Sequence, residues 1–152
     1  MAEIEVPVLV VGGSLVGMTA ALLPGHYGVR SLVVEHHRGT AIHPRAASVT
    51  QRTMEIFRSV GLEELVRAKS EAQFVQDAVW SASRRLWAVR RRIAHRELQR
   101  GHTRDLSPTV RVFLSQNVLE PTLREAAERL GARIEFSTEC VSFEQDAGGV
   151  ER

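Results

Sequence analysis

The chain has 152 residues, of which 43% are hydrophobic, so it can bury one core of ordinary size and a single domain is expected. Its formal net charge is only +2, and its basicity is local: eight arginines face a single glutamate between positions 84 and 104, so no general nucleic-acid partner is expected. A single cysteine, Cys140, excludes an intrachain disulfide and a cysteine-cluster metal site, and it favours a reducing compartment such as the cytoplasm.

An uncharged run from Val6 to Leu23 has about the length of a membrane span. Acidic residues precede it, where a signal peptide would be basic, and three glycines interrupt it. Its first part, Val6–Val11, is rich in β-branched residues and is typical of a strand buried on both faces, whereas its second part repeats apolar residues at helical spacing. We therefore expect a strand, a glycine turn and a helix, and no membrane span.

A second buried-strand pattern, Ser31–Glu35, follows this helix, and Gly28 is placed to end the helix before it. Residues 4–35 have the length of a βαβ unit, in which the strands are parallel and the crossover is right-handed. One residue disagrees with a continuous helix, because Pro24 removes a hydrogen bond and clashes with the carbonyl four residues earlier. We expect the helix to end near Leu23 or to kink there.

The turn before this helix has the spacing of a phosphate-binding glycine loop. In such loops the first glycine makes a tight turn, the second lets phosphate approach the backbone, and the third lets helix and strand pack closely. Gly12 and Gly17 take the first and third places, and the small Ser14 takes the second. The free amides at the helix N-terminus attract a pyrophosphate, and Glu35 is placed to accept hydrogen bonds from ribose hydroxyls. The sequence therefore predicts a dinucleotide site, against the alternative of a tight turn that binds nothing.

Three adjacent or nearby histidines follow the second strand: His36, His37 and His43. They could suggest a metal site, but no set of carboxylate or cysteine partners accompanies them. Histidines in polar loops usually face water, so no metal is expected.

Further helices and strands are expected along the chain. The stretches TQRTMEIFRSVGL and LEELVRA predict two amphipathic helices separated by Gly61, and VLEPTLREAAERLG predicts a third that ends at Gly131. The residues expected on their buried faces are Met54, Phe57, Val60, Leu62, Leu65, Val66, Leu119, Leu123, Ala127 and Leu130. The alternating stretches ARIEFS and ECVSFEQD predict strands, so the fold class is α/β.

Residues 76–104 interrupt this pattern with an arginine-rich stretch. A helix from Ala82 to Gln99 would be basic and amphipathic, and could meet an anionic membrane surface or RNA. A local disturbance of the reading frame is an alternative, and the protein sequence does not decide between the two.

Three stretches together resemble one known family: VLVVGGSLVGMTAALL, LVVEHHRGTAIHPRAASVTQRTMEIFRSVGLEELV and RVFLSQNVLEPTLREAAERLGA. The resemblance is to the FAD-dependent aromatic hydroxylases, the single-component flavoprotein monooxygenases related to para-hydroxybenzoate hydroxylase, and within them to the branch that tailors aromatic polyketides. It covers residues 4–75 and 106–147. It implies a Rossmann-like FAD-binding βαβ fold with a parallel sheet, present here as an incomplete domain over residues 1–152.

The resemblance also implies site residues. The glycine loop and the acidic residue after the second strand would hold the ADP half of FAD, through Gly12, Gly13, Ser14, Leu15, Val16, Gly17 and Glu35. Arg45 would lie near the FAD phosphates and flavin; a surface loop arginine is the alternative, but its polar, proline-bearing connection after the second strand is where α/β folds place ligand-contacting loops. Gln116 would contact the cofactor, although Asn117 and Glu120 form a capping-box pattern in which Gln116 merely precedes a helix. Val141 would lie on a strand beside the adenine.

In the family that the chain resembles, NADPH or NADH reduces bound FAD, and oxygen is then used to hydroxylate a small aromatic substrate, phenolic or polyketide. The chain ends at DAGGVER, before the second cofactor motif and the substrate domain of such enzymes. We therefore expect an amino-terminal fragment with no catalytic residue of its own. A noncatalytic dinucleotide-binding module and a nonfunctional truncated relic are the alternatives, and the oligomeric state is not predicted.

Overall fold

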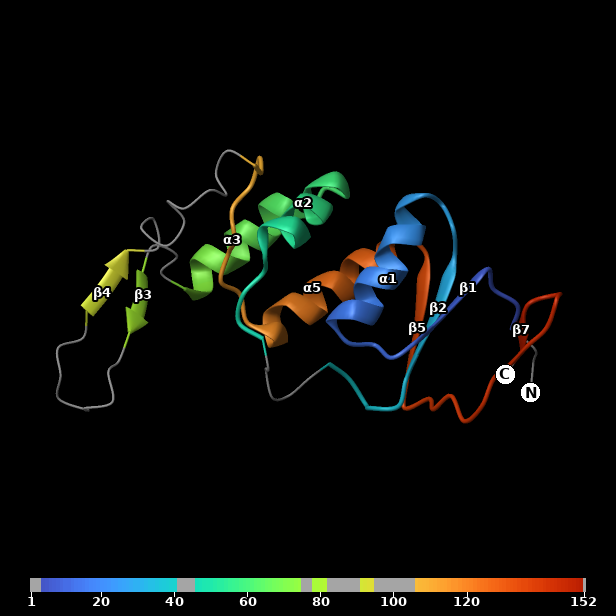
Figure 1. Ribbon diagram of the computed structural model, residues 1–152. Coiled ribbons are helices and arrows are strands. Elements are labelled where there is room, and N and C mark those ends of the chain that lie inside the picture. The colour runs from blue at the N-terminus through green and yellow to red at the C-terminus, as the bar shows by residue number, and fades with distance from the viewer. Residues whose placement is uncertain (1–3, 41–45, 75–77, 82–90, 95–105, 152) are drawn as a thin grey trace. The chain divides into compact units, whose positions relative to one another are not determined.

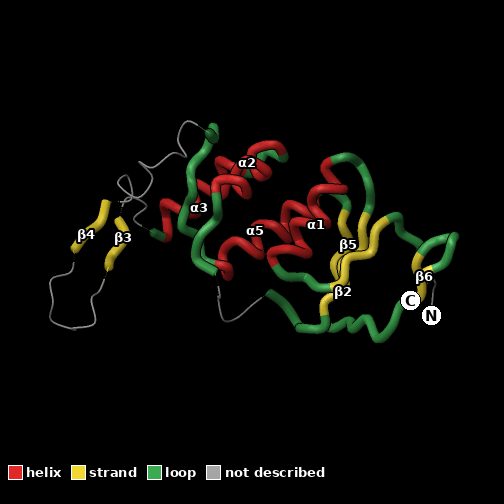
Figure 2. The backbone as a smooth tube through the Cα atoms, in the orientation of Figure 1, coloured by secondary structure: helices red, strands yellow, loops and turns green. Residues whose placement is uncertain are grey.

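The computed structural model describes residues 4–40, 46–74, 78–81, 91–94 and 106–151 (Figure 1). The chain divides into two compact units, one formed by residues 1–45 and 116–152 and the other by residues 46–115. Helices and strands of both units are shown in Figure 2.

A parallel sheet of three strands forms the centre of the first unit. Its strands are β1 (Val8–Val11), β2 (Ser31–Glu35) and β5 (Ala132–Phe136), in the order β1-β2-β5. Val8 pairs with Ser31, and Ser31 pairs with Ala132 on its other side. All five residues of the central strand β2 are buried, as its continuous apolar run predicts. The expected α/β fold with a parallel βαβ unit is confirmed.

The uncharged run from Val6 to Leu23 contains β1 and most of α1 (Leu15–His26), with the glycine turn between them. Among the residues that the structure describes, no helix is long and apolar enough to cross a bilayer.

Of the two alternatives expected at Pro24, an end of the helix near Leu23 is wrong, because α1 continues through Pro24 to His26, and a kink there stays a prediction. The proline leaves only the carbonyl of Ala20 without its usual partner, and Ala20 is exposed, so water can bind that oxygen. Gly28 ends the helix as expected, with a φ of +78°. Its N–H donates to Gly25 O (3.0 Å), and Val29 N–H donates to Pro24 O (3.0 Å), which together form a Schellman motif.

Helix α5 (Gln116–Arg129) packs beside α1 in the same unit. A Cβ on Gly25 of α1 would lie 2.9 Å from the Cβ of Leu130, the residue that follows α5. Leu119, Leu123 and Ala127 are buried as predicted, whereas Leu130 is 37% exposed. The helix starts one residue before the expected cap, Asn117, so Asn117 lies within its first turn.

The strand expected over ECVSFEQD is largely absent from the structure. Only Glu144–Gln145 (β6) is extended and paired, with Val150–Glu151 (β7). The residues before β6 are mostly exposed and pair with no strand, so their alternating pattern does not meet a second layer that would bury one face.

The second unit contains the two helices predicted around Gly61, α2 (Gln51–Ser59) and α3 (Glu63–Gln73). Thr50 caps α2, since its side chain accepts a hydrogen bond from Thr53 N–H. The buried apolar side chains from these helices and their connection are Met54, Phe57, Leu62 and Val66. Leu65 was also expected to be buried but is 38% exposed.

The extended segment before α5 pairs on one side with the segment that follows Arg45. Val49 and Val112 exchange backbone hydrogen bonds of 2.8 and 3.1 Å, and Leu114 N–H donates to Ala47 O (3.2 Å). The chain therefore enters and leaves the second unit through two hydrogen-bonded segments.

Side chains of α3 bind the other side of this extended segment. Ser70 Oγ donates to Phe113 O (2.7 Å), and Gln73 Oε1 accepts from Ser115 N–H (3.0 Å) while its amide nitrogen donates to the Ser115 hydroxyl. Backbone groups that have no sheet partner on this side are thus satisfied by side chains.

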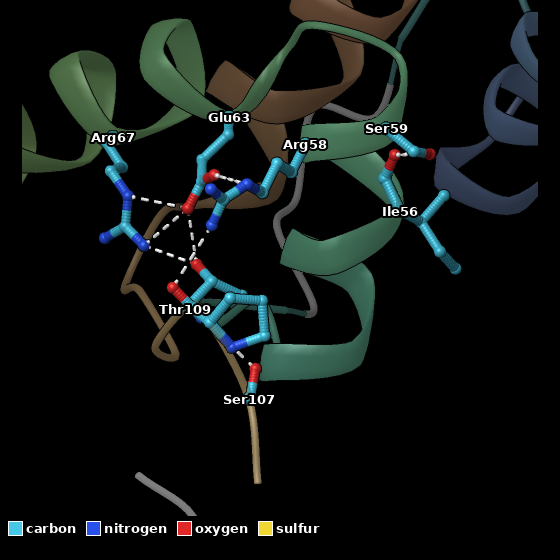
Figure 3. A network of polar contacts seen from close by, with 8 residues as sticks. Ile56, Arg58, Ser59, Glu63, Arg67, Ser107 and Thr109 are labelled. Atoms are coloured by element: carbon cyan, nitrogen blue, oxygen red, sulfur yellow. Dashed lines mark hydrogen bonds and ion pairs between the residues drawn. The ribbon is translucent and has the colours of Figure 1, made fainter. Parts of the chain in front are cut away.

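At its start, α3 contributes a charged network that joins α2, α3 and the same segment (Figure 3). Arg67 Nη2 donates to Glu63 Oε1 (2.8 Å) and to Thr109 Oγ1 (2.5 Å), and Thr109 Oγ1 donates to Glu63 Oε1 (2.5 Å). Arg58 Nε lies 3.7 Å from Glu63 Oε2. The hydrogen bond from Thr109 lowers the pKa of the Glu63 carboxyl, and the two arginines lower it further against the opposing effect of burial.

The helix expected from Ala82 to Gln99 is contradicted where the structure describes that segment. Arg91–Ala94 (β4) is a strand that pairs antiparallel with Ala78–Ser81 (β3). Residues 82–90 and 95–99 lie outside the described residues. The apolar residues of this stretch are too few to separate helical spacing from the spacing of a short strand.

We predict that Glu63→Gln lowers the free energy of unfolding by about 1–2 kcal/mol at pH 7, because the two arginines lose their charged acceptor. The lowered pKa means that this stabilisation is complete above the ordinary value of 4.5 and is lost as the pH falls through the folded pKa. Urea unfolding followed by circular dichroism should therefore show a difference that is complete at neutral pH and shrinks as the pH falls below 4.5. The exposed Glu64→Gln is the matched control; equal effects of the two variants at pH 7 would contradict the prediction.

Candidate functional site

The candidate site lies at the carboxyl edge of the β1-β2-β5 sheet. The loop after β1 and the end of β2 meet at this edge because the strands are parallel. Helix α1 starts at the end of β1 and leads to β2, and α5 leads to β5, so both helices run against the strand direction. Their N-termini therefore lie toward the same edge (Figure 1).

The loop that follows β1 is tight at both of its outer glycines. Gly12 has a φ of +103°, and its N–H donates to Val34 O at 2.8 Å. A Cβ on Gly17 would lie 1.8 Å from Gly12 O, so the helix could not begin this close to the loop with any other residue. The predicted roles of the first and third glycines are thus both visible in the backbone.

Gly13, between them, touches the acidic residue of β2. Its N–H donates to Glu35 Oε2 at 2.6 Å. A Cβ at this position would lie 2.9 Å from Glu35 Cβ, which leaves no room for a side chain. The carboxylate is therefore held directly against the glycine loop.

Glu35 is 8% exposed, and its second oxygen is bound by the residues that follow it. His37 N–H donates to Oε1 at 2.9 Å, and His37 Nδ1 lies 2.6 Å from the same oxygen. Burial raises the pKa of this carboxyl, but the hydrogen bonds from His37 and Gly13 outweigh it and lower the pKa to about 2. Glu35 is thus a fixed anionic acceptor at neutral pH.

The hydrogen bonds from His37 to Glu35 were not predicted from the sequence, in which only the short separation of two residues hinted at them. His36 Nδ1 also lies 3.1 Å from Glu35 Oε1. Ligand atoms of Glu35, His36 and His37 lie within 4.8 Å of one another, which is close enough to share a metal ion. The expectation that no metal binds here stays a prediction.

The N-terminus of α1 presents unpaired amides beside these groups. Ser14 is the N-cap residue and its side chain makes no capping hydrogen bond. The amides of Leu15, Val16 and Gly17 belong to the first turn, where no carbonyl of the same helix can accept from them. The first turn contains no acidic residue, and Val16 is 78% exposed. An anion can therefore approach this helix end.

The remaining predicted site residues have different outcomes. Gln116 is the first residue of α5, and its Nε2 donates to Glu120 Oε1 at 2.6 Å. Val141 is 87% exposed and lies in a loop, so its expected place on a strand is wrong. That loop does approach the site, because Thr138 N–H donates to Glu35 O (2.9 Å). Arg45 lies outside the described residues.

The FAD binding domain family matches residues 5–152. The chain belongs to this FAD-binding family. It is 46% identical over 148 residues to a 4-methyl-5-nitrocatechol 5-monooxygenase of a Burkholderia species, covering 97% of the chain. It is 40% identical over 163 residues to the tetracenomycin A2 monooxygenase-dioxygenase of Streptomyces glaucescens, covering 99% of the chain.

The chain is also similar to solved structures of FAD-containing enzymes. The flavin-dependent monooxygenase PieE, in complex with FAD and substrate, matches 99% of the chain with a TM-score of 0.82 and 37% identity. Aklavinone-11 hydroxylase with FAD and aklavinone matches 99% of the chain with a TM-score of 0.78 and 32% identity.

The chain spans only part of these relatives, namely 27% of the Burkholderia enzyme, 29% of the Streptomyces enzyme and 27% of PieE. The family match also includes residues 76–104, which lie outside the stretches that carry the resemblance in the sequence.

We predict that Gly17→Ala lowers the free energy of unfolding by about 3 kcal/mol or more, because the new methyl group overlaps a backbone oxygen that cannot move without opening the loop. Gly39→Ala is the matched control, since a Cβ there meets nothing within 4 Å and its φ lies outside the left-handed region. Thermal unfolding of the two variants measures the contrast. A Gly17→Ala protein as stable as Gly39→Ala would show that the loop is wider than described.

Proposed function

We propose that this chain binds the ADP half of FAD at the carboxyl edge of its parallel sheet, as the cofactor-binding part of an NAD(P)H-dependent aromatic hydroxylase. The observation that carries the proposal is the combination of an uncapped helix N-terminus, free of acidic residues, with a buried and ionised Glu35 held 2.6 Å from the Gly13 amide. Family membership and FAD-containing structural relatives support it.

The geometry fits the two chemically different parts of ADP. The pyrophosphate would lie at the first turn of α1, where the amides of Leu15 and Val16 and the positive end of the helix dipole stabilise negative charge. The ribose would lie beside Glu35, whose carboxylate can accept hydrogen bonds from hydroxyl groups. Gly13 and Gly17 keep the backbone close enough for both contacts.

The role of these residues in the reaction is binding and orientation. Bound FAD supplies the redox chemistry, taking electrons from NADPH or NADH and using oxygen to hydroxylate an aromatic ring. Glu35 and the glycine loop hold the adenosine end of FAD. Because that end is anchored, the positions that the flavin ring can take are limited. Named activities of the relatives include those of a nitrocatechol monooxygenase and an aklavinone hydroxylase, and we propose a small aromatic or polyketide substrate accordingly. The single cysteine, Cys140, suits a cytoplasmic location.

A nucleotide-binding module that performs no chemistry is the second candidate. It is favoured by one observation: the described side chains that converge at this edge are suited to holding a nucleotide, and none is placed as an acid or base toward a substrate. Consumption of NADPH in the presence of FAD and oxygen would distinguish an enzyme from such a module.

The decisive variant is Ser14→Asp, with Ser14→Asn as its matched control. Asp and Asn are both good N-cap residues, so each should leave α1 as stable as it is with Ser14. The two side chains have the same size, but only Asp places a negative charge where the pyrophosphate is expected, so we predict FAD binding that is weaker by about tenfold or more in Ser14→Asp than in Ser14→Asn. A titration followed by flavin fluorescence measures both.

Equal FAD affinity in the two variants would place the cofactor phosphates elsewhere. Absence of saturable FAD binding by the unmodified chain, shown to be folded by circular dichroism, would overturn the proposed function itself.

A further inference from the structure

Glu120 is a charged residue that is 1% exposed on α5, and the glycine-loop site gives it no role. A buried carboxylate is costly unless hydrogen bonds compensate for its lost hydration. One such bond is the contact from Gln116 Nε2 to Glu120 Oε1 at 2.6 Å. The buried acid therefore acts directly on the residue of α5 that is expected to meet the cofactor.

The spacing of this pair explains the contact. Gln116 and Glu120 are four residues apart in a helix, so their side chains lie on one face, one above the other. Glu120 lies in a buried part of α5, in which Leu119 and Leu123 are buried as well. Its carboxylate is thus a buried point toward which the less buried side chain of Gln116 is oriented.

The chemistry of the pair also fixes which way the amide of Gln116 points. The –NH₂ end of the amide faces Glu120, because its Nε2 is the atom that donates to Glu120 Oε1. The carbonyl oxygen of the same amide is then turned away from Glu120 and is an acceptor. Without the carboxylate, the amide could flip and present a donor instead.

We propose that Glu120 is a positioning residue, which holds Gln116 so that its carbonyl oxygen accepts a hydrogen bond from an N–H or O–H group of FAD. This role rests on the proposed function together with the contact between Gln116 and the cofactor that the resemblance implies. Glu120 itself touches no cofactor atom in this scheme.

A double-mutant cycle on FAD affinity tests the proposal. The four proteins are the unmodified chain, Glu120→Gln, Gln116→Ala and the double variant, with the exposed Glu125→Gln on the same helix as the matched control. We expect Glu120→Gln to weaken FAD binding by about five- to tenfold in the unmodified background, and by less than about twofold once Gln116 is alanine. Glu125→Gln should change neither.

A purely structural role for Glu120 predicts the same weakening in both backgrounds, and that result would overturn the proposal. Absence of FAD binding by the unmodified chain would instead overturn the proposed function. An unchanged affinity in Gln116→Ala would leave the proposed function standing and overturn the contact of Gln116 with the cofactor, and the positioning role with it.

A second measurement needs no FAD and no buried substitution. In a ¹⁵N-labelled chain, the side-chain amide signals of Gln116 are those that disappear in Gln116→Ala. We expect one of their two protons to be shifted downfield and slow to exchange with solvent, because it is bonded to the buried carboxylate. Two equivalent and rapidly exchanging protons would overturn the proposal even if Glu120→Gln does not fold.

Discussion

The candidate site depends first on the contact between the start of α1 and the backbone of the glycine loop. A side chain on Gly17 would overlap Gly12 O, so only glycine lets the helix begin this close to the end of β1. The close start places the first-turn amides at the sheet edge and leaves Gly13 against Glu35. The same loop is tied to the neighbouring strand through the bond from Gly12 to Val34. Loss of this one contact would therefore disturb the sheet and the cofactor site together.

At this edge of the sheet, the described residues stabilise negative charge mainly through backbone N–H groups and not through basic side chains. Glu35 is kept ionised because Gly13 and His37 donate to it, with its pKa lowered to about 2. A short distance away, the end of α1 carries partial positive charge and no acidic residue. A nucleotide that combines hydroxyl donors with an anionic pyrophosphate matches both features, whereas a simple anion would use only one of them. The second unit stabilises its own buried carboxylate, Glu63, in the opposite way, with the arginine side chains of Figure 3.

Sequence analysis succeeded where local sterics decide the structure. The βαβ unit and its glycine turn follow from a buried apolar run and from positions that tolerate no side chain. It failed where the outcome depends on surroundings: α1 continues through Pro24 because the carbonyl left unpaired at Ala20 is exposed, and residues 91–94 form a strand instead of a basic helix. Val141 was expected on a strand, but its segment lies in a loop of the described residues and pairs with no strand. The burial of Glu120 could not be predicted from the sequence either, because it depends on what α5 packs against.

We propose that this chain holds the ADP half of FAD rather than its flavin half. Competition binding with ADP and FMN against FAD tests it most directly, because each competitor carries one half of the cofactor. The account predicts that ADP displaces FAD from the chain and that FMN does not. Displacement by FMN with no effect of ADP would contradict the account, and it would place the bound cofactor away from the glycine loop and Glu35.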